Sequence, residues 1–311
     1  MTVKPMVAVL PDSQSEYLAA VALGGGIAAD LSETSTGLIW TDSADSVGLA
    51  EILRAYPKIG WVQLPFAGVD NFQAVFDEVS RLENPPLFTS AKGAYREPVA
   101  EHALMLALAL ARVLPERIRA RAWGRKYADT LFDSKVLILG GGGIAQEIAR
   151  LLAPFRADVT VVRKNLESIP NVSRVLGLDS LSSLLPEADF VFLASALTEE
   201  TRGLFDSKLF ELMKDSAYLI NIARGAIVDS AALENALISG QIAGAGIDVT
   251  DPEPLPEGHS LWNCPNLIIT PHTADTPEMC VRLLSSRIVE NVKALIASEP
   301  LVGQVNLKLG Y

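Results

Sequence analysis

The chain has 311 residues, more than a single hydrophobic core usually serves, and this length predicts two domains. Apolar residues make up 49% and charged residues 20% of it, as in an ordinary globular protein. The formal net charge is -11, and an acidic surface repels phosphate backbones and anionic lipids. We therefore expect neither nucleic acid nor a membrane surface as a partner, and any anionic ligand must meet locally placed cations.

The spacing of the cysteines and the lengths of the apolar runs bear on where in the cell the protein is expected. Cys264 and Cys280 stand apart from each other and from any cluster of metal-ligand side chains, which predicts free thiols, no disulfide and no metal site. The first apolar stretch, Met6–Leu10, is too short for the core of a signal peptide. The longest apolar run, Ala103–Ala111, is about half as long as a membrane span. We therefore expect a cytoplasmic protein.

Short β-like runs alternate with helix-like stretches along the chain. Several of the runs are continuously apolar, which is typical of strands buried on both faces of a parallel sheet. Helical patterns such as Ala145–Leu152 and Ser230–Ser239 lie between them, so the pattern predicts an α/β fold with crossover connections. The predicted strands are Val7–Leu10, Leu38–Trp40, Trp61–Leu64, Val136–Leu139, Val159–Val162, Phe190–Leu193, Ala217–Ile220, Ala245–Val249 and Leu267–Thr270.

Two features mark the expected domain boundaries. Turn residues at 91–98 precede a long helical pattern, and a second helical pattern, Pro277–Ser298, follows Pro271. If the last helix returns to the first domain, residues 1–98 and 284–311 form a discontinuous substrate domain and residues 99–283 a dinucleotide-binding domain. We expect two doubly wound, Rossmann-like α/β domains with parallel sheets and an active site in the cleft between them.

The segment Lys135–Leu152 reads as a strand, a glycine turn and a helix. Gly140, Gly142 and Ala145 fit the pattern G-x-G-x-x-G/A. In this pattern the first glycine permits the turn, the second lets the backbone approach a pyrophosphate, and the small third residue packs the helix on the strand. Because the helix N-terminus offers free N–H groups, we expect a dinucleotide to bind at Gly140, Gly142, Gly143 and Ile144.

The same spacing recurs at Gly24, Gly26 and Ala29, so the pattern alone is weak evidence. These residues follow a helix-like run, Tyr17–Leu23, and turn residues and the strand at Leu38 come after them. A phosphate loop needs the order strand, loop, helix, and therefore we interpret this segment as a turn.

The second strand of the nucleotide unit predicts which cofactor is preferred. In a NAD-binding unit this strand usually ends in a carboxylate that holds the ribose hydroxyls. Here it ends in Arg163 and Lys164, without a carboxylate. Two cations suit the 2′-phosphate of NADP, so we expect NADP to be preferred, with NAD as the alternative. A solvated basic turn is the competing interpretation.

Three further stretches place polar side chains after predicted parallel strands, where open α/β sheets bind ligands. They are LINIARGAIVD around Arg224, GIDVTDPEPLP around Glu253 and LIITPHTAD around His272. Together with the glycine loop, their order and spacing resemble the D-isomer-specific 2-hydroxyacid dehydrogenase family from about Trp61 onward. The Trp-Val-Gln opening and the Gly-Tyr ending are most similar to its glyoxylate and hydroxypyruvate reductase branch.

The resemblance implies an oxidoreductase that transfers a hydride between NAD(P)H and a small 2-oxo or 2-hydroxy acid. An imidazolium can protonate the carbonyl oxygen, a neighbouring carboxylate orients the ring and favours its charged form, and a guanidinium grips a carboxylate. By resemblance, His272 is the acid/base, Glu253 its partner and Arg224 the substrate clamp. Taken singly, each residue also has a structural interpretation, in a salt bridge or a loop.

Further cofactor contacts are implied by the resemblance. Asp248 ends a predicted strand and is expected to contact the nicotinamide carboxamide, with a structural loop carboxylate as the competing interpretation. The run FLASALTEETRGLF is similar to a cofactor-lining segment of the family, but Ala196 stands where the family usually has proline. The remaining expected cofactor contacts are Ala196, Thr201 and Ala223.

The stretch WVQLPFAGVD resembles the family's substrate loop, in which backbone N–H groups hold a carboxylate. Phe66, Ala67 and Gly68 are the expected donors and act with Arg224, whereas a tight turn after a strand is the competing interpretation. Gly93 and Tyr95 are weaker candidates for the same site.

The apolar helical segment Val99–Ala111 needs cover, and the resemblance points to dimers through this region, so we expect a homodimer. His102 and Trp123 are expected in the core or at the dimer interface. A dinucleotide-sensing corepressor of the same fold is the alternative function, although the sequence has no obvious peptide-binding surface or disordered tail. Formate oxidation needs a Gln-type partner for the histidine, and Glu253 argues against it.

Overall fold

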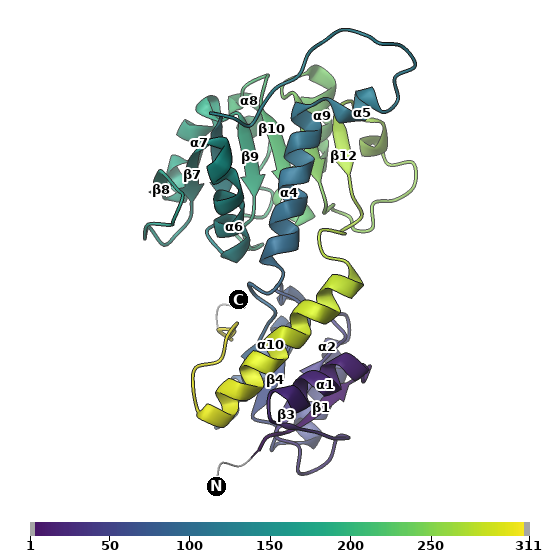
Figure 1. The fold of residues 1–311 in the computed structure, drawn as a ribbon, viewed down its shortest axis with the longest axis vertical. Coiled ribbons are helices and arrows are strands. Elements are labelled where there is room, and N and C mark those ends of the chain that lie inside the picture. The colour runs from purple at the N-terminus through teal and green to yellow at the C-terminus, as the bar shows by residue number, and fades with distance from the viewer. Residues whose placement is uncertain (1–3, 308–311) are drawn as a thin grey trace. The chain divides into compact units, whose positions relative to one another are not determined.

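The computed structural model describes residues 4–307 and divides the chain into two compact α/β units (Figure 1). Unit 1 comprises Met1–Tyr95 and Thr276–Tyr311, and unit 2 comprises Arg96–Asp275. The chain therefore passes between units at 95–96 and 275–276, where the sequence placed these passages at 98–99 and 283–284. The difference arises because the helices α4 and α10 begin at Arg96 and Pro277, each close to a passage.

Unit 1 is built on a five-stranded sheet in the order β2-β1-β3-β4-β5, in which all neighbouring strands are parallel. The strands are β1 Met6–Leu10, β2 Ile27–Ala28, β3 Gly37–Trp40, β4 Trp61–Gln63 and β5 Leu87–Thr89. The helices are α1 Ser15–Leu23, α2 Ser46–Ala55, α3 Gln73–Val79 and α10 Pro277–Ala297. The C-terminal helix α10 packs along α1, so the end of the chain returns to the first unit (Figure 1).

The core of unit 1 and its glycine-rich turn follow from the sequence pattern. Apolar residues of the strands, such as Leu38 and Trp40, pack with Leu49 of α2 and Phe76 of α3 in one buried cluster. The helix α1 ends at Gly24, and the chain enters β2 at Ile27. The interpretation of this second glycine pattern as a turn is therefore confirmed.

Unit 2 contains a seven-stranded parallel sheet in the order β12-β11-β10-β9-β6-β7-β8. The strands are β6 Lys135–Leu139, β7 Asp158–Val162, β8 Arg174–Leu176, β9 Phe190–Leu193, β10 Tyr218–Asn221, β11 Gly244–Ile247 and β12 Leu267–Ile269. The helices are α4 Arg96–Ala111, α5 Leu114–Arg117, α6 Gly143–Leu152, α7 Leu181–Leu184, α8 Ser207–Leu212 and α9 Ser230–Ser239. The α/β class and the two parallel sheets predicted from the sequence are confirmed.

The strand order places a ligand site in unit 2. From β6 the chain proceeds to β7 and β8 on one side, and β9 pairs with the other side of β6. The carboxyl ends of β6 and β9 are therefore the topological switch point, where open α/β sheets bind dinucleotides.

The helix α4 is covered by its own unit. It packs against α6, β10 and β11, and it buries Val99, Ala103, Leu106 and Leu110. The argument that this helix needs a partner subunit for cover is therefore wrong, because the sheet and a neighbouring helix cover it. Within residues 4–307, no helix has the length and apolar character needed to cross a membrane.

Large apolar side chains are exposed in the segment that follows α4. Trp123 is 90% exposed, so it does not lie in the core of this chain. We call residues 112–132 the post-α4 segment; its exposed large apolar residues are Leu114, Ile118, Trp123, Tyr127 and Phe132.

Candidate active site

The glycine loop between β6 and α6 lies at the switch point. Gly140 has a φ of 112°, and a Cβ there would lie 2.3 Å from the carbonyl oxygen of Ala194, so only glycine permits this contact with the end of β9. Gly142 is extended and precedes the first turn of α6, and Ala145 is buried. The first N–H groups of α6 have no partner within the helix, and this arrangement binds phosphate.

Ser195, which lies beside the glycine loop, has a hydroxyl group that also indicates a polar ligand. Its backbone nitrogen would lie 2.8 Å from a Cβ on Gly140. Its hydroxyl is shielded from solvent and has no hydrogen-bond partner among the described residues. A buried, unpaired hydroxyl is unfavourable by about 1–3 kcal/mol, which a polar ligand would relieve. The residues present therefore fit a dinucleotide. The sequence analysis did not include Ser195 among the cofactor contacts, although Ser195 lies in the run FLASALTEETRGLF.

Arg163 follows β7 directly and contacts the glycine loop. Its Nη1 donates to the carbonyl of Gly141 at 3.2 Å, and its Nη2 donates to the carbonyl of Glu167 at 2.7 Å. Its Nε is shielded and has no hydrogen-bond partner among residues 4–307. The carboxylate of Glu167 accepts instead from Asn165 at 3.0 Å. The guanidinium is thus fixed beside the loop that is expected to hold the phosphates.

The segment after β9 is held by its own hydroxyl groups. The Thr201 hydroxyl donates to the carbonyl of Ala196 at 2.9 Å and accepts from the N–H of Thr198 at 2.8 Å. These bonds constrain the loop at the position where proline is usual in the family. Lys164 forms an ion pair with Glu200 of this segment at 2.8 Å, and both side chains are exposed. Of the two expected cations, Arg163 contacts the glycine loop and Lys164 is paired with a carboxylate.

Asn221, the last residue of β10, shapes the loop that carries Arg224. Its Oδ1 accepts from the N–H of Ala223 at 3.0 Å, and its Nδ2 donates to the carbonyl of Arg224 at 3.0 Å. A Cβ on Gly225 would lie 2.0 Å from the carbonyl carbon of Thr250, so glycine lets this loop contact the turn after β11. Arg224 Nη1 donates to the carbonyl of Ala223 at 2.8 Å.

Glu253 and His272 lie side by side after β11 and β12. His272 Nδ1 and Glu253 Oε1 are 2.6 Å apart, and Glu253 Oε2 accepts from the N–H of Thr250 at 3.2 Å. The side chain of His272 is 47% exposed and that of Glu253 is 41% exposed, so a small molecule can reach them. Because Glu253 engages Nδ1, the ring is oriented and its Nε2 remains for proton exchange with a ligand.

Asp248, next to the end of β11, fixes the loop that carries His272. Its carboxylate accepts from the N–H groups of Thr273 at 2.9 Å and Ala274 at 3.0 Å. Its carbonyl accepts from the N–H of His272 at 2.8 Å. His272 has a φ of 51°, a backbone region unfavourable for most side chains, and these bonds hold the loop there.

His102 of α4 contacts the same carboxylate. Its Nε2 lies 2.9 Å from the Thr270 hydroxyl and 3.4 Å from Asp248 Oδ1. Burial raises the pKa of Asp248, but hydrogen bonds from His102, Thr270 and two backbone N–H groups outweigh it and hold the pKa below its ordinary value. These bonds favour the structural interpretation of Asp248, and contact with the cofactor stays a prediction.

The loop after β4 has free backbone donors. The carbonyl of Phe66 accepts from the N–H of Ala91 at 3.0 Å, and the carbonyl of Pro65 accepts from the Tyr95 hydroxyl at 2.6 Å. In contrast, among the residues that the structure describes, the N–H groups of residues 66–68 have no hydrogen-bond partner. Such a set of N–H groups is able to bind a carboxylate. This loop belongs to unit 1, whereas the other candidate residues belong to unit 2.

Comparisons with known proteins agree with this geometry. Residues 103–274 match the model of the D-isomer specific 2-hydroxyacid dehydrogenase, NAD binding domain. The chain is 34% identical over 223 residues to human glyoxylate reductase/hydroxypyruvate reductase, which covers 68% of this chain and 67% of that relative. It is 30% identical over 264 residues to glycerate dehydrogenase from Methylorubrum extorquens, with 81% and 80% covered.

A solved structure extends the likeness to the whole chain. The D-isomer specific 2-hydroxyacid dehydrogenase from Xanthobacter autotrophicus Py2, in complex with NADPH and MES, has a TM-score of 0.83 and 27% identity to this chain. The likeness covers 99% of this chain and 100% of that one. The family resemblance inferred from the sequence is confirmed. The chain therefore belongs to the D-isomer specific 2-hydroxyacid dehydrogenase family and is an NAD(P)-dependent oxidoreductase.

Proposed function

We propose that this chain reduces a small 2-oxo acid, such as glyoxylate or hydroxypyruvate, to the 2-hydroxy acid and prefers NADPH as the reductant. The observation that carries the proposal is the 2.6 Å contact between His272 and Glu253, in loops that follow strands of the same sheet as the glycine loop. The relatives named glyoxylate reductase/hydroxypyruvate reductase and glycerate dehydrogenase support a small acid substrate. They are enzymes, which favours catalysis over the corepressor alternative.

The proposed roles follow from the chemistry of each side chain. When bound, the dihydronicotinamide supplies a hydride to C2 of the 2-oxo acid. His272 donates the proton on Nε2 to the carbonyl oxygen, which becomes the hydroxyl, and Glu253 stabilises the imidazolium and its orientation. Arg224 donates to the substrate carboxylate, as do the N–H groups of Phe66, Ala67 and Gly68.

The residues proposed to hold the cofactor lie at the carboxyl ends of the strands of unit 2. The phosphates are expected at the N-terminus of α6, and the Ser195 hydroxyl adds a donor that sequence reasoning did not include. Arg163 and Lys164 are proposed for the 2′-phosphate. The complete proposed set is Gly140, Gly142, Gly143, Ile144, Arg163, Lys164, Ser195, Ala196, Thr201, Ala223 and Asp248.

The first prediction tests the acid/base. His272→Ala is expected to lower kcat by about a hundredfold or more, because a positioned general acid contributes at least that much. NADPH binding, measured by the change in nucleotide fluorescence, is expected to persist. His259→Ala is the matched control, since His259 caps a short helix and its Nδ1 accepts from the N–H of Leu261 in the same turn. An active His272→Ala variant would disprove the assignment.

The second prediction tests the substrate clamp. Arg224→Lys keeps the charge but loses the planar fork of donors, so kcat/KM for the 2-oxo acid is expected to fall about ten- to a hundredfold. Steady-state kinetics with the exposed Arg202→Lys as control measures this effect. If Arg224→Lys had the kcat and KM of the wild type, the positive charge alone would suffice, and the proposed role of the planar fork of donors would be wrong.

The third prediction concerns the cofactor. Charge-assisted hydrogen bonds from Arg163 to the 2′-phosphate, reduced by solvent screening, are expected to give about a tenfold to hundredfold preference for NADPH in kcat/KM. Arg163→Ala is expected to abolish most of this preference. Lys164→Ala is expected to have a smaller effect, because Lys164 is exposed and paired with Glu200. Equal kcat/KM values for NADPH and NADH in the wild type, or a preference that survives in Arg163→Ala, would contradict the proposal.

The fourth prediction concerns assembly. The exposed apolar side chains of the post-α4 segment favour a homodimer, because several large apolar side chains exposed in one segment are typical of an interface. Light scattering at micromolar concentration is expected to give 2 × 33.3, about 67 kDa. Ile118→Asp is expected to shift the mass toward the monomer, whereas Leu23→Asp, at an equally exposed site of unit 1, is not. A wild-type mass of one chain would overturn the proposal.

A further inference from the structure

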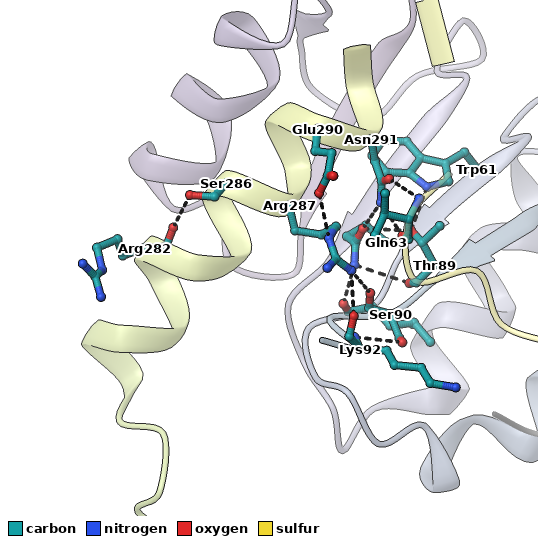
Figure 2. A network of polar contacts seen from close by, with 12 residues as sticks. Trp61, Gln63, Thr89, Ser90, Lys92, Arg282, Ser286, Arg287, Glu290 and Asn291 are labelled. Carbon is teal, nitrogen blue, oxygen red and sulfur yellow. Dashed lines mark hydrogen bonds and ion pairs between the residues drawn. The ribbon is translucent and has the colours of Figure 1, made fainter. Parts of the chain in front are cut away.

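A buried polar network lies in unit 1 where β4 and β5 end (Figure 2). The last residues of these strands, Gln63 and Thr89, are fully buried, and the Thr89 hydroxyl donates to Gln63 Oε1 at 2.8 Å. Trp61 Nε1 donates to the Thr89 hydroxyl at 2.9 Å, and Asn291 of α10 donates to Gln63 Oε1 at 3.0 Å. The network therefore fixes α10 against the carboxyl ends of both strands.

Arg287, one turn before Asn291 on α10, extends this network beyond β5 (Figure 2). Its Nη1 donates to the carbonyls of Ser90 at 3.2 Å and Lys92 at 3.0 Å. Its side chain is 8% exposed, and its Nε lies 3.3 Å from the carboxylate of Glu290, which is 55% exposed. Desolvation of a guanidinium is unfavourable, and solvent weakens a half-exposed ion pair. The guanidinium is nevertheless kept in this buried position, where it joins α10 to the segment that follows β5.

The segment that Arg287 holds is bonded to the loop of residues 66–68. Ala91 lies between the two carbonyls that accept from Arg287, and its N–H donates to the carbonyl of Phe66 at 3.0 Å. On the other side of the loop, the N–H of Leu64 donates to the carbonyl of Thr89 at 2.7 Å. The loop is thus bonded to Ala91, and the guanidinium is one of the groups that hold the segment around Ala91, together with the bond from the N–H of Ser90 to the carbonyl of Gly303 at 2.8 Å.

We propose that Arg287 is a positioning residue for substrate binding, which holds the 66–68 loop through Ala91. The inference rests on the proposed function, because it assigns the free N–H groups of this loop to the substrate carboxylate. A loop fixed before binding loses less conformational freedom when the acid binds, and a fixed positive charge nearby attracts an anion. Both effects act on substrate affinity, so the loss of Arg287 is expected in KM rather than in kcat.

Arg287→Met tests the proposal, since it removes the donors and the charge but retains an unbranched apolar side chain. The KM for glyoxylate is expected to rise about tenfold or more, with little change in kcat or in the dissociation constant for NADPH. Arg287→Lys keeps the charge and a donor, and it is expected to recover part of the affinity. Arg282→Met is the matched control, because Arg282 is an exposed arginine of the same helix whose side chain lies apart from the network in Figure 2.

Hydrogen–deuterium exchange of the ligand-free chain provides a measurement that does not depend on activity. The amides of Leu64 and Ala91, which donate to the carbonyls of Thr89 and Phe66, are expected to exchange faster in Arg287→Met than in the wild type or in Arg282→Met. If Arg287→Met does not fold, Arg287→Gln takes its place with the same expected results. An unchanged KM, a loss confined to kcat, or unchanged exchange at Leu64 and Ala91 in the folded variant would overturn the proposal. A wild type that reduces no 2-oxo acid would refute the proposed function, whereas the exchange result would still decide whether Arg287 positions the loop.

Discussion

The buried carboxylate of Asp248 is the interaction on which the arrangement of the candidate catalytic residues depends. It accepts from the N–H groups that follow His272 and from the Thr270 hydroxyl, so β11, β12 and the histidine loop are joined at one point. His102 adds a contact from α4, which packs against β10 and β11. With this loop fixed at a positive φ, His272 lies within hydrogen-bond distance of Glu253, and a single buried charge thereby sets the geometry of two exposed side chains.

Two close backbone contacts complete the site in unit 2. Gly140 permits the loop after β6 to contact the end of β9, and Gly225 permits the loop after β10 to contact the turn after β11. In each case a Cβ would meet backbone atoms, which have little freedom to move. These glycines therefore join the cofactor loop and the Arg224 loop to their neighbours along the carboxyl edge of one sheet, where parallel strands direct their connections.

The sequence predicted the elements whose signal is local. Nine strands were found from their apolar runs, and the glycine loop from its strand and helix context. The strands β2, β5 and β8, of two or three residues each, were missed. The order, spacing and types of Arg224, Glu253 and His272 were enough to identify the family, because the chemistry constrains them. The contact of His102 with Asp248, and that of Arg287 with Ser90, were not predicted, because each forms only after segments distant in sequence have packed.

The two units support their functional loops by different means, and this difference bears on specificity. In unit 2 the cofactor residues are held by short-range features: glycine contacts, helix termini and a side chain that follows its own strand, as with Arg163. In unit 1 the 66–68 loop is held by α10, more than two hundred residues later in the chain, through Arg287 and Asn291. On the proposed assignments, a change of cofactor preference needs substitutions at one strand end. In contrast, the proposed role of the 66–68 loop makes affinity for the acid depend on how a distant helix packs, so substitutions far from the substrate in sequence would alter it.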